Sequence, residues 1–256
     1  MQLDMSGKVV IVTGGSQGIG RGIAVRFLAE GADVVICARH PPPAPIASGE
    51  RVAFFVAADV REPDQVDAVV SQTLERLGRV DVLVNNAGGS PPADAATVSP
   101  RFSASIIQLN LVAPLIFAQR VNTVMQKQDN GGSIVNIASV SATRPSPGTA
   151  AYGAAKAGLI SLTQSLAVEW APKVRVNAVV AGIMRTEKAH LHYGDEGAMA
   201  RVAATVPLGR MGEPEDVANA CLYLASPLAR YVSGACLAVH GGGEAPAFLR
   251  AAAGVQ

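Results

Sequence analysis

The chain has little charge and few aromatic side chains, and this excludes some classes of partner. Of its 256 residues, 16% are charged and 4% are aromatic, and the formal net charge is +1. Proteins that bind nucleic acids or acidic membrane surfaces usually carry basic patches that attract their anionic partners. This sequence has no basic tract with aromatic residues interspersed. We therefore expect neither a nucleic acid nor a membrane as a partner.

Cysteine is also scarce, and histidine forms no metal-binding cluster. Cys37, Cys221 and Cys236 lie far apart in apolar stretches. An odd, scattered set is typical of buried reduced thiols rather than of a disulfide framework. His190 and His192 could form a metal pair, but no cysteine or carboxylate cluster accompanies them. We expect no metal ion, and we interpret both histidines as loop residues that touch substrate or solvent.

Long apolar runs are lacking as well, and we expect no secretory leader. No stretch reaches the roughly eighteen continuous apolar residues that a membrane-spanning helix needs. Residues 1–8 are polar, and the apolar run after them ends in glycines, which differs from the pattern of a secretory signal. The sequence therefore predicts a cytoplasmic protein.

The chain is rich instead in short apolar segments, with 49% hydrophobic residues and 26 glycines. Apolar runs typical of buried strands alternate with amphipathic stretches typical of helices. The expected strands are 8–13, 33–38, 52–57, 80–84, 133–138, 174–180 and 235–239. The expected helices include 21–30, 63–77, 100–126, 151–171 and 214–225. This alternation predicts a single α/β domain over residues 1–256, with a Rossmann-like, doubly wound, mainly parallel sheet and helices on both faces.

A glycine-rich turn lies between the first expected strand and the first expected helix. Residues 14–20 read Gly-Gly-Ser-Gln-Gly-Ile-Gly, with the spacing Gly-x-x-x-Gly-x-Gly. Glycines let the backbone approach a pyrophosphate closely, and a helix N-terminus offers free N–H groups and positive partial charge. A plain tight turn is the alternative interpretation. Because strand and helix lie where a phosphate site needs them, we favour nucleotide binding.

A tyrosine and a lysine four residues apart indicate acid–base chemistry. Tyr152 and Lys156 follow Ser139 by thirteen and seventeen residues, and positions four apart share one face of a helix. An ammonium beside a phenol lowers the phenol's pKa, and a serine hydroxyl could hold the oxygen that gains or loses a proton. These groups suit the interconversion of an alcohol and a carbonyl. A surface tyrosine beside a solvated lysine is the alternative.

Taken in order, the motifs resemble those of the short-chain dehydrogenase/reductase family in its compact form with Tyr-x-x-x-Lys. The resemblance covers residues 7–243 and includes enzymes similar to 3-oxoacyl-carrier-protein reductase. It rests on T-G-G-S-Q-G-I-G at 13–20, A-D-V at 58–60, N-N-A-G at 85–88, G-I-M-R-T at 182–186 and G-R-M-G-E-P-E-D-V-A at 209–218, together with the four residues discussed next.

The resemblance implies hydride transfer between a nicotinamide and a carbonyl or secondary alcohol carbon. Tyr152 would donate or accept the proton, Ser139 would hold the carbonyl oxygen, and Lys156 would stabilise the phenolate and bind the nicotinamide ribose. Asn110 would support a water relay through the lysine, and Pro114 predicts a helix disturbed near it, with free carbonyls. A helix-capping or bend-satisfying amide is the alternative for Asn110.

The resemblance also implies the cofactor site, at which Asp59 would accept from the adenine amino group; an ordinary turn aspartate is the alternative. The segment 86–88 would line the ribose, and the residues after the sixth strand would bind the carboxamide and phosphate. The implied cofactor-binding residues are Gly14, Ser16, Gln17, Gly18, Ile19, Gly20, Arg39, Asp59, Val60, Asn86, Ala87, Gly88, Tyr152, Lys156, Gly182, Met184 and Thr186.

The end of the second strand bears on the choice of cofactor. An NAD-preferring site usually has an acidic residue there, and none occurs between Val34 and Ser48. Arg39 stands where it could bind the 2′-phosphate of NADP, so we expect NADP(H) to be preferred, with NAD(H) possible; a solvated arginine is the alternative. Prolines at 41, 42, 43 and 45 exclude a helix after this strand and favour extended backbone.

Residues 185–206 match the family's variable substrate-covering segment, called the covering segment below. The family's quaternary structure implies a homotetramer, and Phe248 and Leu249 would favour a subunit interface over water. His240 replaces an aspartate that is common in the family near its assembly contacts. The substrate is a small carbonyl or alcohol compound whose identity the sequence leaves open.

Two other functions are weighed against an oxidoreductase. A catalytically silent NADP-binding sensor or scaffold of the same fold would usually lack Ser139, Tyr152 or Lys156, and all three are present. A methyltransferase with a glycine loop would need neither the tyrosine–lysine pair nor the segment 85–88. We therefore favour an active enzyme, since the site and not the fold carries the function.

Overall fold

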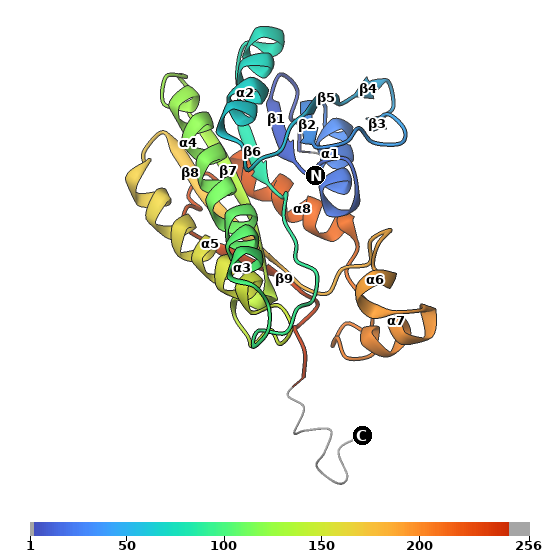
Figure 1. Cartoon of the computed structure of the whole chain (residues 1–256). Helices are drawn as coiled ribbons and strands as arrows, with labels where there is room; N and C mark the ends of the chain where they lie inside the picture. Colours follow the sequence, from blue (N-terminus) through green and yellow to red (C-terminus); the bar gives the residue numbers. More distant parts are fainter. Residues whose placement is uncertain (1–2, 246–256) are drawn as a thin grey trace.

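A seven-stranded sheet forms the centre of the structure, a computed structural model that describes residues 3–245. The strand order is β5-β2-β1-β6-β7-β8-β9, and all neighbouring strands are parallel (Figure 1). The strands are β1 (Val9–Thr13), β2 (Asp33–Ala38), β5 (Phe54–Ala57), β6 (Val82–Asn85), β7 (Gly132–Ser139), β8 (Val174–Ala181) and β9 (Cys236–Val239). The predicted Rossmann-like α/β fold is confirmed.

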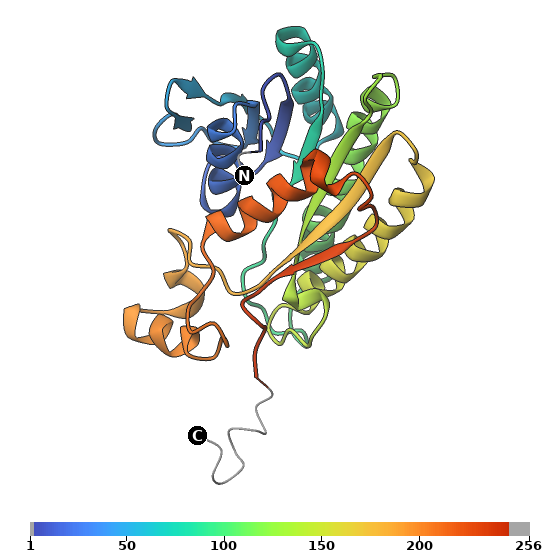
Figure 2. The same cartoon turned by 180° about the vertical axis from the view of Figure 1, so that it is seen from behind.

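Helices cover both faces of this sheet. Helices α1 (Gly18–Ala29) and α8 (Pro214–Ala225) pack together on one face, and α2 (Pro63–Leu77), α4 (Ala113–Met125) and α5 (Ala150–Glu169) cover the other (Figures 1 and 2). Side chains of β1 alternate between the two layers. Val10 and Val12 lie in the core under α1 and α8, whereas Ile11 lies in the core under the opposite helices. Burial on both faces explains why the strand sequences are continuously apolar.

The segment after β2 departs from a regular strand–helix alternation, as the prolines predict. No helix forms between β2 and β5; residues 47–52 instead form a short antiparallel hairpin of β3 (Ala47–Ser48) and β4 (Arg51–Val52). The single strand expected at 52–57 is therefore wrong at its start, because Val52 pairs with Ala47 in the hairpin and only residues 54–57 join the main sheet. The hairpin packs against α1.

The helix expected at 100–126 is interrupted, as Pro114 predicts. Helix α3 (Pro100–Ile107) passes through a π-helical turn at Gln108–Val112 into α4. Pro114 has no N–H to donate to the carbonyl of Asn110, so the regular hydrogen-bond ladder cannot continue there. The wider turn places the Asn110 side chain in the interior, where it is fully buried.

The combined helix Pro100–Met125 is, by length and composition, apolar enough to cross a membrane, with a mean hydropathy of 1.5 over its most apolar window. This is weak evidence for a membrane span, because helices that pack on a sheet can have the same composition. Phe117, Val121 and Met125 of this helix are buried in the core against the sheet. We interpret it as a core helix.

The described cysteines are free thiols, but their burial differs from our expectation. Cys37 and Cys221 are buried, whereas Cys236 is exposed. The expectation for Cys236 was wrong because β9 is the last strand of the sheet and alternate residues of this strand face outward. Phe248 and Leu249, expected at a subunit interface, lie outside the described residues.

The topology places the site at the carboxyl ends of the strands. From β1 the sheet extends through β2 and β5 on one side and through β6 to β9 on the other. A ligand crevice forms where the winding direction changes, between β1 and β6. The covering segment lies beyond the end of β8 and contains α6 (His190–Tyr193) and α7 (Glu196–Ala203) (Figure 1).

Candidate active site

The turn between β1 and α1 requires glycine at particular positions. Gly14 and Gly18 have φ angles of 65° and 54°, which L side chains rarely adopt. A Cβ atom on Gly20 would lie 2.3 Å from the carbonyl oxygen of Gly14. Glycine is therefore needed both for the shape of the loop and for its contact with α1, and the resulting backbone lines a large cleft.

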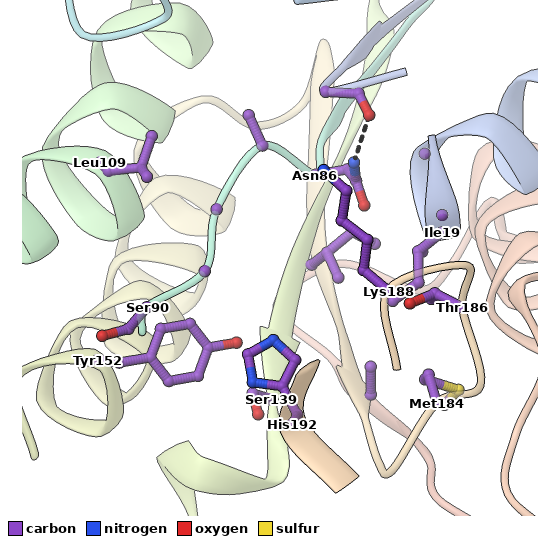
Figure 3. A pocket seen from close by; sticks show the side chains of 18 of the residues that line it. Ile19, Asn86, Ser90, Leu109, Ser139, Tyr152, Met184, Thr186, Lys188 and His192 are labelled. Atoms are coloured by element: carbon purple, nitrogen blue, oxygen red, sulfur yellow. Dashed lines mark hydrogen bonds between the residues drawn. The ribbon is translucent and has the colours of Figure 1, made fainter. Parts of the chain in front are cut away.

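Hydrogen bonds from the segment after β6 fasten that segment to the glycine loop. The backbone N–H groups of Asn86 and Ala87 donate to the Thr13 hydroxyl at 2.9 and 3.0 Å. The Asn86 side-chain amide donates to the Thr13 carbonyl at 2.9 Å. It also donates to the Gly14 carbonyl at 3.3 Å, the bond drawn in Figure 3. These bonds hold the two walls of the predicted ribose and phosphate sites in one rigid unit.

Asn110 supports the same wall from behind. Its side-chain oxygen accepts from the Gly89 N–H at 2.9 Å, and its amide donates to the carbonyls of Gly89 and Ile106, both at 2.9 Å. A Cβ atom on Gly88 would lie 2.6 Å from the Asn110 oxygen. Asn110 does not line the cleft. Its three hydrogen bonds are those of a bend-satisfying amide, and the water relay stays a prediction.

Ser139, Tyr152 and Lys156 meet at the end of the central strands. Ser139 is the last residue of β7, and Tyr152 and Lys156 lie one turn apart in α5. The Lys156 nitrogen lies 5.7 Å from the centre of the Tyr152 ring and donates to the carbonyl of Ile137 at 2.7 Å. In Figure 3 the Tyr152 hydroxyl points toward Ser139 and the imidazole of His192.

Burial is the largest influence on the pKa values of Tyr152 and Lys156, the predicted catalytic pair. It raises the pKa of the Tyr152 phenol, which its hydrogen bond with Ser139 partly offsets. It also lowers the pKa of Lys156 to about 8. The expectation that the ammonium lowers the phenol's pKa is wrong for this arrangement, because desolvation is the larger effect and the ammonium is directed to the Ile137 carbonyl. A tyrosine that keeps its proton is prepared to act as an acid.

The end of the cleft near β2 carries two arginines and an aspartate. Arg39 is exposed, directly after β2. Asp59 forms a double hydrogen bond with Arg61, with distances of 2.9 and 2.5 Å, and these bonds hold the pKa of Asp59 below its usual range. Arg39 adds a further favourable charge near Asp59. Because Arg61 lines the cleft beside Arg39, the end of the cleft near β2 is more basic than the A-D-V motif at 58–60 indicates.

The residues after β8 form the opposite wall. A Cβ atom on Gly182 would lie 2.6 Å from the Cβ atom of His240, so this position accepts only glycine. Met184 is buried and forms a bridge with Gly212. Thr186, in the covering segment, faces the glycine loop (Figure 3), and a Cβ atom on Gly18 would lie 3.5 Å from its methyl group.

These walls enclose a single cleft of about 800 Å³. All the predicted catalytic and cofactor-binding residues line it, with the exception of Asn110. Its volume suits a dinucleotide, and the glycine loop with the N-terminus of α1 lines it. The residues present therefore fit a nicotinamide dinucleotide, with the phosphates at the glycine loop. Beyond Tyr152 the cleft continues between polar side chains, namely Ser90, Ser141, Arg144, Ser146, His192 and Tyr193.

Several lining residues were not predicted as site residues. Arg61, Glu187 and Lys188 line the cleft, and Thr13 holds its wall. Arg61 directly follows the A-D-V motif, so its position was a usable signal. Glu187 and Lys188 lie in the covering segment, where no motif marks a ligand-binding residue.

The site is that of a dinucleotide-dependent oxidoreductase, and the chain belongs to the short-chain dehydrogenase/reductase family. The sequence profile of the family described as Enoyl-(Acyl carrier protein) reductase matches residues 14–244. The chain is 36% identical over 249 residues to a 3alpha-hydroxysteroid dehydrogenase of Mediterraneibacter gnavus, covering 94% of this chain and 98% of that protein.

Relatives named for sugar substrates are equally similar. The chain is 37% identical over 245 residues to an L-rhamnose 1-dehydrogenase (NAD(P)(+)) of Azotobacter vinelandii, covering 92% of this chain and 96% of that protein. The ligand-free structure of Thermoplasma acidophilum aldohexose dehydrogenase superposes with a TM-score of 0.85 at 35% identity, covering 92% of this chain and 93% of that one. The chain is therefore an oxidoreductase that acts on an alcohol or carbonyl with an NAD(P)(H) cofactor.

Proposed function

We propose that this protein transfers hydride between NADP(H) and a small carbonyl or secondary alcohol substrate, with NADP(H) preferred over NAD(H). The observation that carries the proposal is the convergence of Ser139, Tyr152 and Lys156 on one cleft with the glycine loop. When bound, the nicotinamide would supply or accept the hydride. The covering segment at 185–206 would close over the substrate.

The chain's own residues would handle the oxygen and its proton. In reduction, the Ser139 hydroxyl would hold the carbonyl oxygen, and Tyr152 would donate its proton to the oxygen as negative charge develops there. Lys156, whose buried ammonium has a lowered pKa, would stabilise the phenolate left behind. Asn110 would keep the segment after β6 in place through its bonds to Gly89.

Turnover by a Tyr152→Phe variant tests the proposed acid. Loss of a positioned acid–base group typically lowers the rate by about 10²–10⁴-fold. We expect kcat to fall by that amount while the dissociation constant for NADPH stays within about twofold, because the glycine loop is untouched. Tyr223→Phe, which lies on α8 away from the cleft, is the matched control. Unchanged turnover in Tyr152→Phe would remove the tyrosine from the mechanism.

The preference for NADP(H) is supported by Arg39 and by the absence of an acidic residue after β2. A hydrogen bond to a charged group contributes about 1.5–3 kcal/mol, so Arg39→Asp should weaken NADPH binding roughly 10- to 100-fold. NADH, which lacks the 2′-phosphate, should bind with similar or higher affinity. Calorimetric titration of both cofactors measures this, with Arg101→Asp on α3 as control. An unaltered NADPH-to-NADH ratio contradicts the preference.

A catalytically silent protein that binds the cofactor is the alternative. It would show cofactor binding in the titrations above but no turnover with any carbonyl or alcohol in a screen. The presence of all three catalytic side chains favours the enzyme. We also propose that the protein is cytoplasmic and forms a homotetramer. The tetramer is supported by exposed apolar residues such as Tyr231 and Val168, which are 100% and 80% exposed in the single chain.

A further inference from the structure

The N-terminus of α1 is capped by a carboxylate from a distant part of the chain. Gln17 at the N-cap position makes no capping side-chain hydrogen bond, and the first turn has no acidic residue. Instead, the Gly18 N–H donates to the carboxylate of Glu187 at 3.0 Å. The guanidinium of Arg21 lies 3.7 Å from the other oxygen of Glu187. A residue of the covering segment thus supplies the anion that this helix end lacks.

The carboxylate of Glu187 lies at the predicted phosphate site of the cofactor. Gly18 belongs to the glycine loop, whose free N–H groups and positive helix end suit a pyrophosphate. The carboxylate of Glu187 uses one of those N–H groups and a nearby cation. A carboxylate and a pyrophosphate that share one small site repel each other. Cofactor binding at the loop therefore requires Glu187 to leave.

The next residue has the opposite charge and points into the cleft. Figure 3 shows the Lys188 side chain extending across the cleft from the covering segment toward Asn86, next to Ile19 and Thr186. Among residues 3–245, Lys188 has no carboxylate within ion-pair distance. Lysine is a common phosphate ligand because its ammonium is a flexible point charge.

We propose that Glu187 and Lys188 are residues of the cofactor's phosphate site and act in sequence. Glu187 is a resident anion that closes the glycine loop before the cofactor binds. The pyrophosphate displaces it, and Lys188 then binds the pyrophosphate. This inference rests on the proposed function, since it needs a dinucleotide in the cleft. Because both residues lie within three positions of the start of α6, the exchange couples cofactor binding to the position of His192 and Tyr193 at the substrate end.

The displacement of Glu187 should weaken cofactor binding in the native chain. The side chains of Arg21 and Glu187 are 57% and 56% exposed, and exposed charge contacts contribute up to about 1 kcal/mol, or roughly fivefold in affinity. Removing the competing charge should therefore strengthen binding by up to that factor. Removing the Lys188 charge should weaken binding by a similar factor.

Titration of Glu187→Gln and Lys188→Gln with NADPH and with inorganic pyrophosphate tests the proposal by calorimetry. We expect Glu187→Gln to bind both about fivefold more tightly, and Lys188→Gln to bind both about fivefold more weakly. Glu196→Gln removes another covering-segment carboxylate, which pairs with Arg185 at 2.8 Å, and Lys127→Gln removes a lysine distant from the cleft. Both controls should bind as the wild type does.

Each outcome bears on a separate claim. If Glu187→Gln binds pyrophosphate no better than Glu196→Gln does, the resident-anion role is wrong. If Lys188→Gln matches Lys127→Gln, Lys188 is not a phosphate ligand. In both of these cases the proposed function stands as long as the wild type binds NADPH or NADH. If the wild type binds neither, the proposed function itself fails, and pyrophosphate binding still reports on the exchange at the loop.

A second measurement follows the covering segment directly. Amide hydrogen exchange of residues 187–193 should increase when pyrophosphate alone displaces Glu187 from the wild type. In Glu187→Gln the exchange of this segment should already be fast and should not respond to pyrophosphate. If amide hydrogen exchange of residues 187–193 in the wild type stays constant at saturating pyrophosphate, the coupling between phosphate binding and the covering segment is wrong.

Discussion

At the scale of single residues, burial controls the charges that the chemistry needs. Lys156 is 3% exposed, and its pKa falls from 10.5 to about 8. Its ammonium is held by the Ile137 carbonyl at 2.7 Å and has no carboxylate partner among the described residues. A cation that is costly to bury is typical of functional sites, since packing alone would not retain it.

The titration of Lys156 should be visible in the stability of the fold. Between pH 8 and 10.5 the unfolded chain binds the proton and the folded chain releases it, so the free energy of unfolding rises with pH across this window. The lowered pKa corresponds to about 3 kcal/mol. We therefore expect the wild type to gain stability relative to Lys156→Met as pH rises from 7.5 to 10, measured by urea unfolding.

A surface lysine provides the control for that measurement. Lys173 donates to the carbonyl of Gln128 at an exposed position, so Lys173→Met reports any change of stability with pH that comes from losing a lysine that is not buried. A flat difference between the wild type and Lys156→Met would show that burial does not depress this titration.

At the scale of elements, the contact between the glycine loop and α1 joins stability to cofactor binding. A methyl group on Gly20 would lie 2.3 Å from the Gly14 carbonyl oxygen and 2.5 Å from the Asn86 amide. Neither neighbour can move freely, because the Asn86 amide is bonded to Thr13. The helix start and the wall of the ribose site must therefore shift together if this position gains a side chain.

We expect Gly20→Ala to lower the free energy of unfolding by about 1–3 kcal/mol, the usual range for overpacking. Thermal unfolding with and without NADPH measures both consequences, and the stabilisation by NADPH should be largely lost. Gly197→Ala, at an exposed position in the first turn of α7, is the control and should maintain or slightly increase stability. Equal behaviour of the two variants would contradict the close contact.

The π-helical turn at Gln108–Val112 supports the wall of the cleft. It places Asn110 where three hydrogen bonds tie it to Gly89 and Ile106. Asn110 affects the site only through Gly89, because Gly89 lines the cleft and Asn110 does not. Asn110 is thus a positioning residue in this structure.

At the scale of the whole molecule, the sheet ends in a strand with an exposed face. Strand β9 is last in the sheet order, and Cys236 and Ala238 on it are exposed. Nearby Tyr231 is fully exposed. An edge strand with small apolar residues is a surface on which a second copy of the chain can pack, which agrees with the proposed tetramer.

Ala238→Arg should interrupt such packing and reduce the mass of the assembly in solution. Size-exclusion chromatography with light scattering measures this at fixed protein concentration. Val52→Arg in the hairpin, a residue 57% exposed on another surface, is the control and should leave the mass unchanged. A wild-type chain that runs as a monomer contradicts the tetramer directly.

Much of the fold was predictable because local sequence decides it. Apolar runs marked the strands of the main sheet, and the helices 63–77 and 214–225 have the predicted bounds. Pro114 indicated the interrupted helix, and the prolines after β2 excluded a helix there. The hairpin at 47–52 was missed because its pairing depends on packing against α1, which no local pattern reveals.

The sequence by itself determined the family and the glycine loop, and it predicted Ser139, Tyr152 and Lys156 as the catalytic residues, because the chemistry requires those residue types at those spacings. Only the tertiary structure decided that desolvation raises the pKa of Tyr152, that Asn110 supports the wall from behind, and that Glu187 reaches Gly18 across 169 positions. The physical reason is that burial, charge proximity and capping depend on which segments meet in space, and a linear pattern does not specify this.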